Sequence, residues 1–129
     1  MTADEITLTL PRSRDFHRIA HLVLGGLAVR LDLTFEHLED LQLALAELLA
    51  EPEASGEVTV RLRVIDGAVQ AAVGPFSREH LRRRLEADGD SRLGLRRMLD
   101  TVADSVGIEE AAEGDWVEVT MHVEQAGAR

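Results

Sequence analysis

The stretch LDLTFEHLEDLQLALAELLAEP, residues 31–52, carries the signals of a complete amphipathic helix. Thr34 can cap its start, because a threonine hydroxyl accepts a backbone N–H of the first turn, and Pro52 lies just beyond its end. The spacing therefore predicts a helix over residues 35 to about 51, with one leucine face toward a core. That face consists of Leu38, Leu41, Leu45 and Leu48.

The opposite side of this helix is acidic and holds Glu36, Asp40, Glu47 and Glu51. A solvated acidic face accounts for all four carboxylates without any chemistry. Glu47, however, stands in the middle of an apolar run, so a catalytic carboxylate is the alternative interpretation.

On the N-terminal side, ITLTL (6–10) alternates as a strand does, and Pro11 ends it. Ser13 can cap a first helix that extends to about Arg30. Its glycine pair, Gly25 and Gly26, weakens the helix by about 1 kcal/mol per residue relative to alanine, which suggests close packing against another element. The expected buried face is Phe16, Ile19, Ala20, Val23, Leu24 and Leu27.

On the C-terminal side, EVTVRLRVID (57–66) alternates strictly, and the Asp66-Gly67 pair predicts a hairpin turn to a return strand over 68–73. GPFS (74–77) interrupts that strand, and Ser77 caps a short polar helix. A further helix over 93–106 is expected to place Leu95, Met98, Leu99, Val102 and Val106 inward and to stop at Gly107. Strands follow over 108–112 and in WVEVTMHVE (116–124), which Trp116 opens.

The element order is thus β-α-α-β-β-(α)-α-β-β. Because the strands come as hairpins, we expect a two-layer α/β sandwich with a mostly antiparallel mixed sheet and helices on one face. At 129 residues the chain is expected to form a single domain spanning 1–129.

Composition narrows the function classes. The chain has no cysteine, and all 14 basic residues are arginine, which excludes thiolate and lysine chemistry. A net charge of −10 argues against direct nucleic-acid binding. No apolar run predicts a membrane span, and the start lacks a signal peptide, so a cytoplasmic protein is expected. The arginines at 82–84, 92, 96 and 97 form either a local anion site or solvated partners for the many carboxylates.

This order, with a glutamate in the second helix, resembles the histidine-kinase-like (GHKL, or Bergerat) ATPase fold, and more narrowly the anti-sigma-factor serine kinases of the RsbW type. The resemblance covers nearly the whole chain and rests on LDLTFEHLEDLQLALAELLAE (31–51) and RLGLRRMLDTVADSVGI (92–108). In that family a Glu-x-x-x-Asn pair polarises the attacking hydroxyl or water and ligates magnesium. Glu47 matches the glutamate and is the candidate catalytic residue, whereas Glu51 stands at the asparagine position. A carboxylate can ligate magnesium, but it adds charge beside a triphosphate.

The other family motifs depart further. The adenine-reading Asp-x-Gly-x-Gly corresponds to VGPFSRE, with Gly74 at the aspartate position and Pro75-Phe76 in place of the flexible glycines. Losing that hydrogen bond costs about 1.5–3 kcal/mol. In the next motif Gly94 and Leu95 match, but Arg92 replaces the first glycine, and the family's Gly-Thr appears as Gly114-Asp115. The candidate nucleotide-binding residues are therefore Gly74, Arg92, Gly94 and Leu95, and ordinary ATP binding is not expected.

His17 and His21 are spaced i,i+4 and can share a metal only with a third ligand that the segment lacks.

The resemblance implies a regulatory protein without a cofactor, which binds a sigma factor or an anti-sigma antagonist and forms a homodimer, as family members do. The alternative is an active Mg-ATP-dependent serine kinase using Glu47, with Glu51 on magnesium. A dimeric scaffold without either role is the third possibility.

Overall fold

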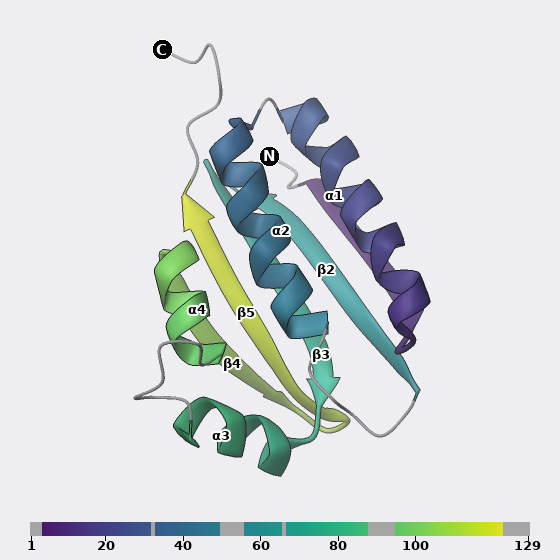
Figure 1. Ribbon diagram of the computed structural model, residues 1–129, viewed down its shortest axis with the longest axis vertical. Coiled ribbons are helices and arrows are strands. Elements are labelled where there is room, and N and C mark those ends of the chain that lie inside the picture. Colours follow the sequence, from purple (N-terminus) through teal and green to yellow (C-terminus); the bar gives the residue numbers. More distant parts are fainter. Residues whose placement is uncertain (1–3, 32, 50–55, 66, 88–94, 123–129) are drawn as a thin grey trace.

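The computed structural model describes residues 4–31, 33–49, 56–65, 67–87 and 95–122, and the structural statements below concern these residues (Figure 1). Its element order matches the one expected from the sequence. The elements are β1 (Asp4–Pro11), a 3-10 turn η1 (Arg14–Phe16), α1 (His17–Leu31), α2 (Phe35–Leu49), β2 (Glu57–Ile65), β3 (Ala68–Phe76), α3 (Arg78–Ala87), α4 (Leu95–Val102), β4 (Ser105–Ala111) and β5 (Gly114–His122).

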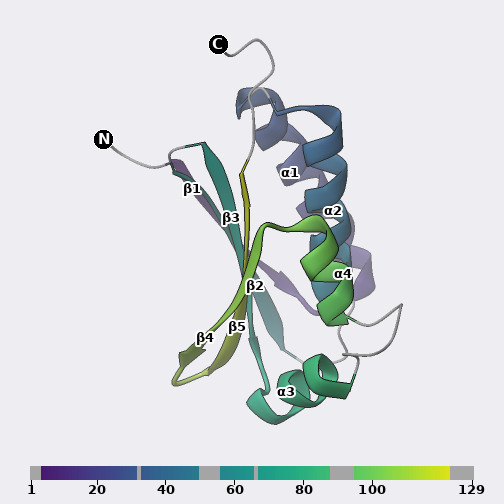
Figure 2. The same cartoon turned by 90° about the vertical axis from the view of Figure 1, so that its left-hand side faces the viewer.

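The strands form one sheet in the order β1-β2-β3-β5-β4, and every pairing is antiparallel. Seen along the sheet, the four α-helices all lie on the same side of it (Figure 2). The expected two-layer α/β sandwich is confirmed. The chain leaves β3 through α3 and α4 before β4 forms the edge, so β5 pairs with β3 in the interior.

The core lies between the sheet and the helices. The alternation expected in β2 is observed, because Val58, Val60 and Leu62 are buried while Arg63 is exposed. Helix α2 covers this face with Leu41, Ala44, Leu45, Leu48 and Leu49, all buried. Thr34 caps α2 as predicted, accepting the backbone N–H of His37 at 3.2 Å. Gly67, at φ 78°, turns β2 into β3 as the Asp-Gly signal predicts.

The expected buried face of α1 is only partly correct. Ala20, Leu24 and Leu27 are buried, but Phe16 and Ile19 are 38% and 39% exposed. The close packing expected at Gly25 and Gly26 is wrong, since a Cβ at either position would meet nothing within 4 Å. The two glycines therefore do not mark a tight contact with another described element.

Two boundaries in the C-terminal half also differ from expectation. The helix predicted over 93–106 ends at Val102, because the chain from Ser105 pairs with β5, and Val106 lies opposite Val119 in that pairing. GPFS does not end β3 at Val73: the strand continues to Phe76, with a register shift between Val73 and Phe76. Long-range pairing outweighs the local helix pattern in one place and the glycine-proline signal in the other.

Candidate functional site

The catalytic candidate Glu47 lies in the last turn of α2, beside the fully buried Leu48. It is half-buried and forms no hydrogen bond or ion pair with another described residue. No described side chain orients its carboxylate. Of the acidic face predicted around it, Glu36 is exposed and Asp40 is half-buried, while Glu51 lies outside the described residues.

Gly74 stands where the family resemblance places the adenine-reading aspartate, and here it has a packing role. A Cβ at this position would lie 2.7 Å from Cδ2 and 2.8 Å from Cγ of Trp116. Trp116 is 7% exposed, and the Arg61 guanidinium lies 4.9 Å from its ring centroid. The indole therefore occupies the space that any side chain at residue 74 would need.

The next two residues, Pro75 and Phe76, are contacted by a residue that follows the edge strand β1. Arg12, directly after β1, donates a hydrogen bond to the carbonyl oxygen of Pro75. Its guanidinium also lies 5.5 Å from the centroid of the Phe76 ring, which is 1% exposed within the core. Where the family has glycines that let the backbone approach a nucleotide, this chain has a buried aromatic ring and an arginine contact.

The Gly114-Asp115 pair, which stands at the family's Gly-Thr position, is also engaged within the chain. A Cβ at Gly114, where φ is 146°, would lie 2.7 Å from the carbonyl oxygen of Phe76, so only glycine fits. Asp115 is buried, and its Oδ1 accepts a hydrogen bond from Nε of Arg78 at 3.0 Å. That hydrogen bond, with the charges of Asp115 and Glu110, raises the pKa of the Arg78 guanidinium.

The remaining candidates give less structural information. Arg92 and Gly94 lie outside the described residues, and Leu95 begins α4, which packs on the core through Leu99. Among the described side chains, no group of three histidine, aspartate or glutamate residues is close enough to hold a metal ion. The described helices also include none that is long and apolar enough to cross a bilayer.

Sequence reasoning missed the residues that fill this region. The roles of Arg12 and Arg78 depend on partners 63 and 37 residues away, and no local pattern signals such pairs. The one available signal in the sequence was the glycine at residue 74, because glycine within a strand often marks the close approach of another group.

A second surface is defined by exposed apolar side chains on α1. Ile19, Leu22, Gly26 and Val29 follow one another at spacings of three or four residues and so share one helix face, which we call the α1 stripe. Leu22 and Val29 are 69% and 84% exposed. Helix α1 packs beside α2 over the β1–β2 side of the sheet (Figure 1). A contiguous exposed apolar surface is a candidate contact site for another protein.

Comparisons with known proteins agree with this architecture. No family profile matches the chain. The serine-protein kinase RsbW of Bacillus subtilis is 25% identical over 130 residues, which cover 83% of this chain and 79% of that protein. The serine-protein kinase RsbW of Listeria innocua is 30% identical over 77 residues, and this match spans 54% of the chain and about half (49%) of the Listeria protein.

A solved structure gives the same result for the fold. The crystal structure of the RsbU and RsbW domains of a Mycobacterium tuberculosis protein superposes with a TM-score of 0.69 over 93% of this chain and 32% of that one. At 18% identity this likeness concerns the fold alone. The chain is thus similar in sequence to the RsbW-type serine-protein kinases and similar in fold to a solved structure that contains an RsbW domain.

Proposed function

We propose that the chain is an anti-sigma-type regulatory protein that acts by binding a protein partner, such as a sigma factor or its antagonist, and that its nucleotide site has degenerated. The kinship with RsbW serine-protein kinases supports the regulatory role. One observation carries the loss of the nucleotide site: the indole of Trp116 fills the space beside Gly74.

This packing matters because adenine recognition by the family depends on a side chain at that position. An aspartate at residue 74 would collide with the indole, and the buried Phe76 stands where a flexible glycine is expected. Rebuilding the contact with adenine requires that Trp116 leave its place under Arg61.

Partner binding is supported by the α1 stripe. Apolar side chains as exposed as Leu22 and Val29 are stabilised when a partner covers them. The chain's net charge of −10 favours a partner with a basic surface, because opposite charges accelerate and orient association. The same stripe is our proposed contact if the protein forms a homodimer.

The second candidate function is an active Mg-ATP-dependent protein serine kinase. It is favoured by Glu47, a half-buried carboxylate with no partner among the described residues, at the position of the family's catalytic glutamate. In that case Glu47 is the general base and Glu51 ligates magnesium.

A thermal-shift titration with Mg-ATP and Mg-ADP separates the two candidates. A ligand present at a hundred times its dissociation constant stabilises by about 2.7 kcal/mol, which is several degrees for a domain of this size. We expect no saturable shift at millimolar nucleotide. A saturable shift, together with phosphate transfer that Glu47→Ala abolishes, would establish the kinase instead.

Partner binding is tested with the immobilised protein and a Leu22→Glu variant, in buffers with and without Mg-ATP. We expect candidate sigma factors or antagonist domains to be retained by the wild type without magnesium or nucleotide and to be lost from the variant. Thr101→Glu, a change at an exposed residue of α4, is the control for the added charge. Retention that requires Mg-ATP, or that both variants keep, would contradict the proposal.

A further inference from the structure

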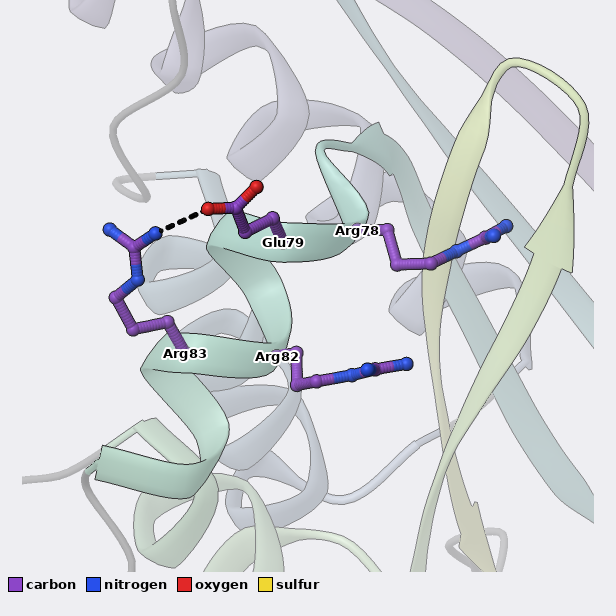
Figure 3. Close-up of a pocket in the computed structure, with 4 residues that line it drawn as sticks. All are labelled: Arg78, Glu79, Arg82 and Arg83. Carbon is purple, nitrogen blue, oxygen red and sulfur yellow. Dashed lines mark hydrogen bonds and ion pairs between the residues drawn. The ribbon is translucent and has the colours of Figure 1, made fainter.

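A groove of about 570 Å³ runs along α3 and is lined by Arg78, Glu79, Arg82 and Arg83 (Figure 3). The helix is fixed in place at its first turn. Ser77 caps it, accepting the backbone N–H of His80 at 3.3 Å, and Leu81 is 1% exposed in the core. The arginines therefore project from a rigid helix rather than from a loop.

The three arginines differ in how their charge is compensated. Arg78 pairs with the buried Asp115 at 3.0 Å, and Arg83 pairs with Glu79 one turn earlier at 2.8 Å. Arg82 is exposed, and no ion pair joins it to any other residue that the structure describes. Figure 3 shows the side chains of Arg78 and Arg82 extending the same way, toward the β4–β5 hairpin, while Glu79 and Arg83 lie on the opposite side of the helix.

The groove is thus a local basic site on a strongly acidic protein. Arg78 and Arg82 are four residues apart, so their guanidinium groups stand one helical turn from each other. A guanidinium binds a carboxylate or phosphate through two parallel N–H···O bonds, which makes arginine well suited to oxyanions. Arg82 offers this contact without an ion pair to another described residue, and Arg78 keeps outward N–H groups because its side chain is 51% exposed.

The charges around the groove favour carboxylates over phosphate. Glu110 acts electrostatically on Arg78 from the hairpin, whereas the charge of Glu79 is paired with Arg83. The nearby negative charge of Glu110 disfavours a compact dianion more than singly charged groups spread along a chain. Carboxylates one helical turn apart on a bound helix, or two residues apart on an extended segment, match the spacing of Arg78 and Arg82.

We propose that this groove binds an acidic polypeptide segment of a partner protein, with Arg82 contacting one carboxylate and Arg78 the outward side of a second. The site is separate from the α1 stripe and does not depend on nucleotide. Through this groove the acidic protein gains a second contact, which selects a negatively charged segment rather than a basic surface.

Fluorescence anisotropy with a labelled short oligo-glutamate peptide tests the proposal at low ionic strength. The matched variants are Arg82→Gln and Arg97→Gln, which remove the same charge from exposed positions on α3 and α4. We expect Arg82→Gln to weaken binding about fivefold, as for an exposed charge-assisted contact, and Arg97→Gln to change it less than twofold. Because the whole protein is negative, non-specific attraction of the peptide is suppressed.

Two further measurements make the result decisive. In NMR spectra, the Nε–Hε signals of Arg78 and Arg82 should shift on titration with the peptide, and an oligo-glutamine peptide of the same length should leave them unchanged. Equal weakening by both variants, or no binding at millimolar peptide, would overturn the proposal. Competition by inorganic phosphate at submillimolar concentration would overturn it too, because the groove would then be a small-anion site. Each outcome is independent of whether nucleotide binds or α1 holds a partner.

Discussion

Replacing Gly74 with alanine tests the packing that underlies the proposed loss of the nucleotide site. The added Cβ would lie 2.7 Å from Cδ2 of Trp116, whereas non-bonded carbons pack at about 3.5–4.0 Å. The ring would therefore have to retreat by about 0.8 Å to restore ordinary contact.

Two interactions resist that movement. The guanidinium of Arg61 lies 4.9 Å from the ring centroid on the outer face, and Nε1 of Trp116 donates to Oε2 of Glu113 at 3.3 Å. Overpacking of a tightly packed site costs about 1–3 kcal/mol. At about 4 °C per kcal/mol for a domain of this size, Gly74→Ala should lower Tm by about 4–12 °C.

The assay is thermal and urea unfolding followed by circular dichroism, with the fluorescence of Trp116, the only tryptophan, as a local probe. Gly26→Ala is the matched control, because nothing lies within 4 Å of its Cβ and it sits within a helix. This control should raise the free energy of unfolding by about 0.5–1 kcal/mol.

A double-mutant cycle identifies the atoms responsible. In a Trp116→Leu background the indole is absent, so Gly74→Ala should cost much less than in the wild type. The reasoning is refuted if Gly74→Ala leaves stability unchanged, or if its cost is the same with and without the indole.

Two other predictions concern α2, the helix that carries Glu47. Leu48→Ala removes a side chain that is 0% exposed and should lower the free energy of unfolding, measured by urea titration, by about 2–5 kcal/mol. A loss below about 1 kcal/mol would contradict the packing described. Thr34→Ala removes the cap on the backbone N–H of His37 and should lower the free energy of unfolding by about 1 kcal/mol, whereas Thr34→Ser should keep most of it. Equal stability of the two variants would show that the hydroxyl does not cap the helix.

The elements that the sequence predicts well are those that short-range chemistry determines. Thr34 caps α2, Leu41, Leu45 and Leu48 of α2 face inward, and β2 alternates, because each depends on neighbours within a few residues. The order of elements was enough to predict the two-layer sandwich, since hairpin strands pair antiparallel and the helices must cover their apolar face.

The candidate site could be predicted only in part, because its decisive contacts are long-range. Glycine and proline normally end a strand, yet β3 runs through Gly74 and Pro75, where Arg12, directly after β1, and Trp116 from β5 contact it. Likewise, Ser105 and Val106 continue a helical pattern locally but pair with β5 in the fold. In both places tertiary pairing decides the structure, and it involves residues far away in the sequence.

The replacements at the nucleotide-binding positions are connected in space, which is why they are better explained together than one by one. Gly74 accommodates the ring of Trp116, and the neighbouring Asp115 holds Arg78 at the start of α3. Gly114 in turn lies against the backbone of Phe76, so β5 and the end of β3 fit one another along the whole junction. Restoring a single family residue would break one of these contacts without opening a cavity for adenine. A partner that needs only the surfaces on α1 and α3 imposes no such requirement, which is why we propose a binding role for this protein.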